Sequence, residues 1–211
     1  MIDVDHQINA VRRTVGTRML EAGEAHVVTL SQSYATDAAD LWDACTNIER
    51  IPRWFLPISG DLRVGGQYQL EGNANGTILT CEPPREFTAT WEYGGAVSWI
   101  EVRISQDGPD RARLELQHIA HVDDHWTQFG PGAVGIGWDL GLVGLAIHLS
   151  TGEAIDPAFG QQWTATEDGR RFMQLSGEAW YVADVAGGAD AETARQAADR
   201  TAAAYLAEAQ N

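Results

Sequence analysis

Three histidines in one short stretch are the residues of this chain whose type and spacing could most directly carry chemistry. His118, His121 and His125 form the pattern H-x-x-H-x-x-x-H, and Asp123 and Asp124 lie between the last two. Histidine can act as a general base, orient a ligand or bind a metal ion. On a strand, residues three apart point to opposite faces, so His118 and His121 would not share an ion. We therefore expect no metal site.

His118 by itself is the stronger candidate for a functional side chain. The segment RARLELQHIAH, residues 111–121, alternates apolar and polar side chains, and the alternation places Leu114, Leu116 and His118 on one face. An inward histidine could orient a ligand or act as a general base, or it could be a buried core group whose hydrogen bonds are satisfied. The sequence leaves both interpretations open.

Other kinds of reactive site have little support in the sequence. Ser98 and Ser105 lack the strand-turn-helix elbow of a serine nucleophile, although distant partners stay open, and neither Cys45 nor Cys81 has a neighbouring histidine. The glycine pair in residues 64–66 precedes a predicted strand rather than a helix, so it is turn chemistry and not a phosphate cradle. We expect no nucleotide or other cofactor.

The charge balance excludes several classes of function. The 211 residues carry 30 acidic and 14 basic side chains, every basic one an arginine, for a formal net charge of -16. Such a field repels phosphate backbones and anionic lipids, so nucleic acid and membrane surfaces are not expected partners. The lack of lysine excludes Schiff-base chemistry. The N-terminal residues lack the apolar run of a secretory signal, which predicts a cytoplasmic location.

The elements that would position His118 are mainly strands. Residues 1–25 carry apolar side chains three and four apart, which predicts a helical N-terminal arm. A strand from His26 and a helix ending before Pro52 follow, the helix capped by Thr36 or Asp37. Five segments between Ser59 and His118, separated by Asn-Gly, Pro-Pro, Gly-Gly and Asp-Gly-Pro turns, predict an antiparallel meander with one apolar face.

A long apolar helix is predicted to cover this face. In residues 131–149 the apolar side chains recur every three or four positions, and five glycines would allow a backbone or a ligand to approach closely. Beyond Ser150, two further helices are predicted around residues 167–186 and 191–209, divided by Gly187-Gly188. Their aromatic residues Phe172, Trp180 and Tyr181 need burial, which predicts docking on the parent domain or across a homodimer.

An ordered set of signals resembles one known family. The chain carries a tryptophan in its first long helix, a Trp-Phe pair, an Asp-Leu-Arg-x-Gly-Gly turn, a Pro-Pro turn, a strand ending in Trp-Glu, a strand ending in histidine and a Gly-Trp pair in the long helix. These are Trp42, Trp54-Phe55, residues 61–66, Pro83-Pro84, Trp91-Glu92, His118 and Gly137-Trp138. Together they resemble the START and birch-pollen-allergen (SRPBCC) superfamily, in the branch of activator homologues of a heat-shock-protein ATPase.

The resemblance implies a fold and a division of the chain. The expected class is α+β, a helix-grip fold in which a curved antiparallel sheet of about six or seven strands wraps a long C-terminal helix, with extra helices in a C-terminal extension. The expected segments are a helical arm at 1–25, the grip domain at 26–150 and the extension at 151–211. Composition and resemblance together suggest a bacterial stand-alone member of the family.

A grip fold whose sheet and helix splay apart leaves an apolar cavity for a lipid, polyketide or aromatic metabolite. Strand alternation and helix period predict ten wall residues, although each of them could instead simply fill a core. They are Trp54, Phe55, Tyr68, Trp91, Ile100, Val102, Leu116, His118, Trp138 and Leu142.

Three functions stay open from the sequence. The leading hypothesis is the binding of a small hydrophobic molecule without evident catalysis. The second is a cyclase or hydrolase in which the cavity and His118 guide proton transfer. The third is a regulator of a chaperone partner, as the family name implies.

Overall fold

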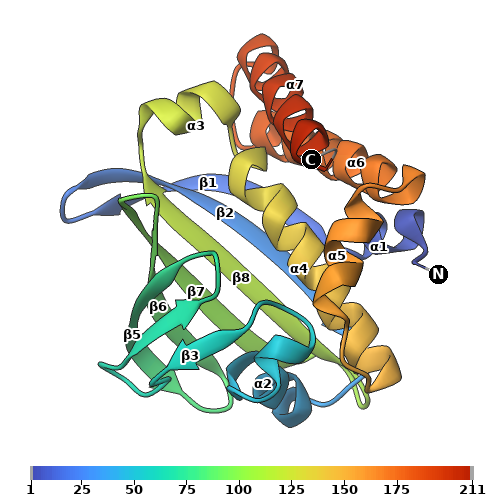
Figure 1. Ribbon diagram of the computed structural model, residues 1–211. Helices are drawn as coiled ribbons and strands as arrows, with labels where there is room; N and C mark the ends of the chain where they lie inside the picture. The colour runs from blue at the N-terminus through green and yellow to red at the C-terminus, as the bar shows by residue number, and fades with distance from the viewer. Residues whose placement is uncertain (1, 210–211) are drawn as a thin grey trace. The chain divides into compact units, whose positions relative to one another are not determined.

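The computed structural model describes residues 2–209, except for the side chains of residues 157–159, 161 and 208. It confirms the α+β class and the helix-grip fold, with one curved antiparallel sheet, a long helix and further C-terminal helices (Figure 1). The strands are β1 Arg12–Leu20, β2 Gly23–Tyr34, β3 Ile58–Gly60, β4 Gln67–Leu70, β5 Asn75–Glu82, β6 Glu86–Tyr93, β7 Ala96–Gln106 and β8 Ala112–His121. The helices are α1 Val4–Ala10, α2 Ala38–Thr46, the 3-10 helix η1 Ile51–Arg53, α3 Asp124–Phe129, α4 Gly132–Thr151, α5 Pro157–Thr164, α6 Glu167–Ala186 and α7 Ala191–Glu208.

The sheet has eight strands in the order β1-β2-β8-β7-β6-β5-β4-β3. Strands β4 to β8 pair consecutively and antiparallel, which confirms the predicted meander. The sequence predicted about six or seven strands, and two of the eight were not predicted. Residues 12–20 form β1, and the short strand β3 precedes the segment 61–72 that was predicted as one strand and contains only β4. Gly65, with φ 81, lies in the turn between β3 and β4, a conformation that favours glycine.

The predicted faces of the meander are confirmed. Ile100 lies opposite His118, and Val102 lies opposite Leu116, in the β7–β8 pair. All four side chains are buried, as the alternation of a half-covered sheet requires. We call the face that carries these residues and Ala89 the inner face.

The predicted helical arm at residues 1–25 is correct only for α1. Residues 12–20 form β1, in which exposed and half-buried positions alternate for most of its length. The three-and-four spacing that suggested a helix ended at Met19, but Met19 is 74% exposed and belongs to no apolar face. The β-branched residues Thr14, Val15 and Thr17 favour a strand, and a short turn leads directly into β2.

The helix α2 is shorter than predicted. Asp37 caps it as expected, since its Oδ1 accepts from the Asp40 N–H at 2.8 Å, but the helix ends at Thr46 rather than just before Pro52. Asn47 redirects the chain, because its side chain bonds Asp43 on one side and the Glu49 N–H on the other. Such local bonds compete with helix continuation.

The long helix α4 forms as predicted and is closely approached by its neighbours at its glycines. A Cβ at Gly135 would lie 2.3 Å from the Trp180 ring, and one at Gly144 would lie 2.2 Å from the Trp54 carbonyl oxygen. Tight packing is therefore one use of the glycines. Among the described residues, α4 alone has the length and hydropathy of a membrane span, but 56% of its most apolar window is buried, as in the core helix of a soluble fold.

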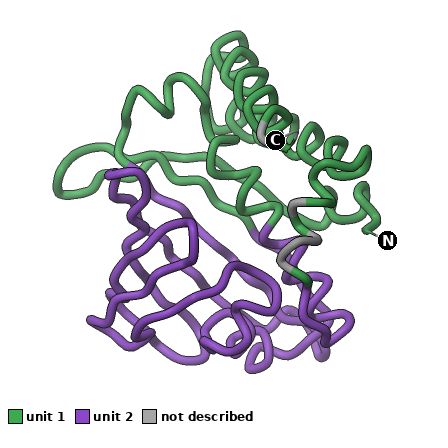
Figure 2. Tube along the Cα trace, in the orientation of Figure 1, with its two compact units in different colours: residues 1–30, 121–140, 156–211 green, residues 31–120, 141–155 purple. Residues whose placement is uncertain are grey.

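The chain divides into two compact units (Figure 2). Unit 1 comprises residues 1–30, 121–140 and 156–211, and unit 2 comprises residues 31–120 and 141–155. In unit 1, α6 lies beside α7 and also contacts α1 and β1 (Figure 1). Trp180 and Phe172 are each 1% exposed, so two of the three aromatic side chains for which docking on the parent domain or across a homodimer was predicted are buried within one chain; Tyr181 is half-buried. The homodimer stays a prediction, and the need to bury these aromatic side chains no longer supports it.

Candidate ligand-binding face

His118 is a buried side chain of the inner face with a defined hydrogen bond. It is 5% exposed, and its Nε2 lies 2.9 Å from the Ser98 Oγ. Ser98 lies opposite Trp91 in the β6–β7 pair, and the Trp91 ring meets the His118 ring edge-on with centroids 6.2 Å apart. The meander thus brings together three residues from three adjacent strands.

The hydrogen-bond pattern indicates the form of this histidine. The Ser98 hydroxyl donates to the Trp91 carbonyl oxygen at 2.9 Å, so its only proton is committed and it must accept from the His118 Nε2–H. Burial lowers the pKa of His118 to about 4, because the interior disfavours the charged form. At neutral pH the inner face therefore presents a neutral imidazole.

This arrangement does not favour nucleophilic catalysis. A serine nucleophile must pass its hydroxyl proton to the histidine that acts as its base, whereas here the histidine donates to the serine. Sequence reasoning found no partner for Ser98, and the structure supplies one, but with the opposite polarity of hydrogen bonding. The Ser98–His118 pair instead fixes the orientation of the imidazole.

The other strand residues predicted as walls are also buried. Ile100, Val102 and Leu116 are between 4% and 7% exposed. Tyr68 is 6% exposed and donates its hydroxyl to the Thr90 carbonyl at 2.6 Å, so its polar end is used within the sheet. Burial raises the pKa of the Tyr68 phenol.

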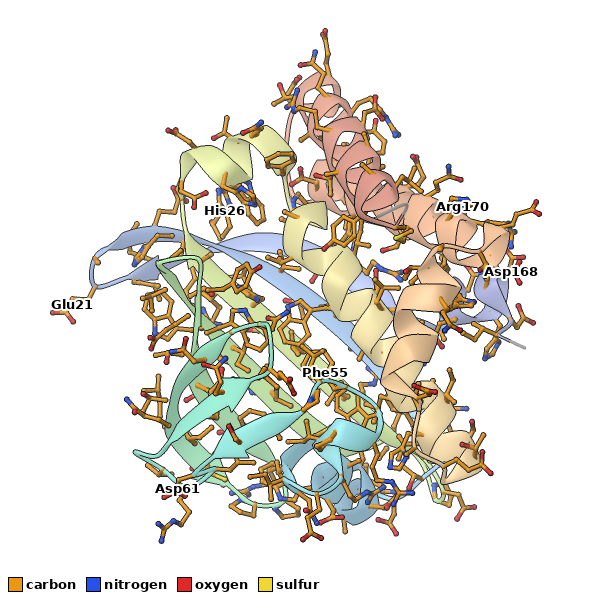
Figure 3. All side chains as sticks on the ribbon, in the orientation of Figure 1. Glu21, His26, Phe55, Asp61, Asp168 and Arg170 are labelled. Carbon is orange, nitrogen blue, oxygen red and sulfur yellow. The ribbon has the colours of Figure 1, made fainter. Side chains whose placement is uncertain are left out.

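Trp54 and Phe55 are held against the second half of α4. The Trp54 Nε1–H donates to the Ala44 carbonyl at 2.9 Å, and its own carbonyl packs on Gly144. The Phe55 ring reaches α4 at Gly141, where an added Cβ would lie 3.3 Å from it. Figure 3 shows the labelled Phe55 beside α4. Both rings remain half-buried. The glycines of α4 therefore let an aromatic loop approach the helix backbone.

A charged cluster around Arg50 precedes the loop that carries Trp54 and Phe55. Arg50 bonds Asp40 at 2.7 Å and Asp43 at 3.0 Å, and its Nη2 lies 3.4 Å from the His148 Nε2. Because an arginine can only donate, the His148 Nε2 must accept, and its Nδ1–H donates to the Glu153 carbonyl at 2.8 Å. His148 in α4 is 2% exposed, and the sequence analysis did not identify it.

The two predicted residues on α4 fall in different units. Leu142 is 4% exposed and belongs to unit 2, which contains nine of the ten predicted wall residues. Trp138 is half-buried and belongs to unit 1. The wall function of all ten stays a prediction, because burial suits a core as well as a cavity.

A second buried polar cluster, in unit 1, was missed altogether. Asp139 in α4 is fully buried and accepts from both Nε and Nη2 of Arg13, at 2.9 and 3.0 Å. Ser176 and Trp180 of α6 also donate to it, at 2.5 and 3.0 Å. The sequence signal for this cluster was one carboxylate, Asp139, within an apolar helix. Its partners lie more than 30 residues away in the sequence, so the pairing could not be predicted.

The three histidines of the H-x-x-H-x-x-x-H pattern have separate surroundings. His118 bonds Ser98, the His121 Nδ1 lies 3.4 Å from the Glu24 carbonyl, and the His125 ring packs on Phe129 within α3. Within residues 2–209, no three His, Cys, Asp or Glu side chains are grouped so that they could hold a metal ion.

Comparison with known proteins identifies the family. Residues 35–149 match the family described as activator of Hsp90 ATPase homolog 1-like protein, and the chain belongs to this family. The predicted resemblance to the SRPBCC superfamily is thereby confirmed.

The solved structures include a protein similar over most of the chain. CalU16 from Micromonospora echinospora is 37% identical in its crystal structure, with a TM-score of 0.65 over 82% of this chain and 98% of that one. Its solution structure is 36% identical, with a TM-score of 0.71 over 85% and 97%. DynU16, described as a putative protein in the dynemicin biosynthetic locus, shares the fold at 17% identity and a TM-score of 0.55, over 61% of this chain and 48% of that one. The search of curated proteins gave no match.

Proposed function

We propose that unit 2 binds a small hydrophobic molecule against the inner face of the sheet. The observation that carries the proposal is the pairing of a half-buried Trp91 ring with a buried, neutral and oriented His118. An aromatic wall beside one oriented hydrogen-bonding group is the usual composition of a small-molecule site. The half-buried Trp54 and Phe55 rings supply further apolar surface in the same unit.

The chemistry of these residues favours an uncharged ligand. A histidine that stays neutral at pH 7 brings no charge to the site, and the surrounding side chains are mostly aliphatic or aromatic. The net charge of -16 further disfavours anions. A lipid, polyketide or aromatic metabolite satisfies these requirements. The description of DynU16 as a protein of a biosynthetic locus is consistent with such a ligand.

A titration of the full chain with the neutral apolar dye Nile red, followed by fluorescence, tests this proposal. Trp91→Ala should weaken binding by about three- to tenfold, the range expected for the loss of one aromatic contact. Trp99→Ala is the matched control, because Trp99 is also a half-buried tryptophan but lies opposite Thr90, on the other face of the sheet. Equal losses in both variants, or no saturable binding to the folded chain, would contradict the proposal.

A further inference from the structure

Unit 1 contains a small hollow lined by its own residues. It lies where α3, the start of α4, α6 and α7 meet, and its volume of about 10 Å³ is room for one water-sized group. Its wall combines aromatic rings, small side chains and a single carboxylate. The lining includes Phe129, Pro131, Trp180, Tyr181, Asp184 and Thr201.

Asp184 is the unusual member of this wall. The residue is 9% exposed, and no hydrogen bond or ion pair joins its carboxylate to any other residue in the described part of the chain. It also lies in the last turn of α6, where the helix dipole is negative and a carboxylate is disfavoured. Burial raises its pKa, in keeping with a carboxylate that lacks a cationic partner.

Two cationic side chains of the neighbouring helix α7 are already engaged elsewhere. Arg195 makes two bonds to Glu178, at 2.7 and 2.9 Å, and lies over the Tyr181 ring. The Nε of Arg200 donates to the Gln128 carbonyl at 2.7 Å. Because the sequence contains no lysine, no ammonium side chain of this chain can fill the hollow.

We propose that this hollow binds the ammonium group of a small primary alkylamine, with Asp184 as its counter-ion. An ammonium group matches a water-sized space beside a carboxylate, and its alkyl stem would extend out of the hollow toward solvent. A hydrated metal ion fits less well, since Ca²⁺ and Mg²⁺ require several oxygen ligands and the wall offers one carboxylate. The net charge of -16 favours the arrival of a cation.

The test is a titration of the full ¹⁵N-labelled chain with n-butylammonium chloride, followed by NMR. Saturable shifts are expected at the Gly132 amide and the Trp180 indole N–H, both of which belong to residues that line the hollow. Potassium chloride at equal ionic strength should not reproduce them, and tetramethylammonium chloride should bind more weakly because it exceeds the space. Equal shifts from either salt would overturn the assignment to a primary amine.

Variants locate the counter-ion. Asp184→Asn should weaken n-butylammonium binding about tenfold or more, as expected when a charge-assisted hydrogen bond is lost. Glu192→Gln removes the same charge from an exposed site on α7 and should leave binding unchanged. Carboxyl ¹³C titration of the unaltered chain gives a second measurement, in which n-butylammonium should lower the pKa of Asp184. Unchanged binding by Asp184→Asn, or an unchanged pKa, would overturn the proposal.

Discussion

At His118, burial and the hydrogen bond to Ser98 determine what the side chain can do. Strand alternation was sufficient to predict that it points inward, because the period of two is a property of any strand. The sequence could not show that Ser98 lies opposite Trp91 and within reach of His118. Pairing register depends on the whole meander, so the neutral, donating form of the histidine became evident only from the structure.

His118 should make the stability of the protein depend on pH. Its pKa is lowered from 6.5 to about 4 in the folded state, so between these values the unfolded chain binds more protons. Stability should therefore be full above pH 6.5 and fall as the pH drops toward 4, by up to about 3 kcal/mol. Denaturant unfolding at a series of pH values between 7 and 4.5 measures this loss.

The control for this prediction is His118→Gln, which can still donate a hydrogen bond to Ser98 but does not titrate. It should show a shallower loss of stability, although not a flat one, because burial also lowers the pKa of His26. If the pH dependence of the variant matched that of the unaltered protein, His118 would not be a buried neutral group.

Arg13 and Asp139 are a buried pair whose separation should be costly. Their side chains are 4% and 0% exposed, so Arg13→Met would leave an uncompensated buried carboxylate. We expect a loss of about 3–5 kcal/mol in the free energy of unfolding, measured with urea. Arg171→Met is the matched control, since it breaks the exposed ion pair with Asp5 and should change little. Similar effects from both variants would contradict the burial of the pair.

At the scale of elements, the meander could be predicted because its turns and alternation are local. The end of α2 could not be predicted from the sequence, and neither could the strand β1, for two different reasons. Asn47 ends α2 through side-chain bonds that no apolar periodicity reveals. In residues 12–20 the helical spacing of apolar residues rested on few positions. The β-branched side chains favour a strand there, and β2 follows after a short turn as its hairpin partner.

The glycines of α4 give an element-scale prediction. Gly144→Ala would place a Cβ 2.2 Å from the Trp54 carbonyl oxygen and should destabilise the fold by about 1–3 kcal/mol, because two backbones would have to separate. Gly160→Ala in α5 meets nothing within 4 Å, so it should be neutral or stabilising by up to about 1 kcal/mol. Thermal unfolding compares the two, and a harmless Gly144→Ala would refute the close approach.

At the scale of the whole molecule, the C-terminal helices were predicted but their role was not. The sequence suggested an appendage, whereas the contacts make α6 part of the core of unit 1, together with the N-terminal hairpin and the start of α4. Aromatic residues that need burial do not reveal which surface buries them. The same limit applies to the inner face of unit 2, where alternation predicts which side chains are covered but not what covers them.

Removal of these helices should therefore unfold unit 1 rather than merely dissociate a dimer. A chain ending at Ile155 would lose Phe172 and Trp180 from the core and two of the donors to Asp139. We expect a lower unfolding temperature and exposed apolar surface, measured by circular dichroism and dye binding. A stably folded, monomeric shortened chain from a dimeric parent, seen by light scattering, would instead assign the extension to dimerisation.

The central claim, that this protein holds a small hydrophobic molecule, is tested most directly by native mass spectrometry. The full chain is incubated with an apolar extract of lipids and metabolites, exchanged into volatile buffer and weighed intact. We predict one or a few discrete added masses on the folded chain, retained by Trp99→Ala and diminished in Trp91→Ala. A folded chain that carries no added mass, or that loses it equally in both variants, would contradict the account.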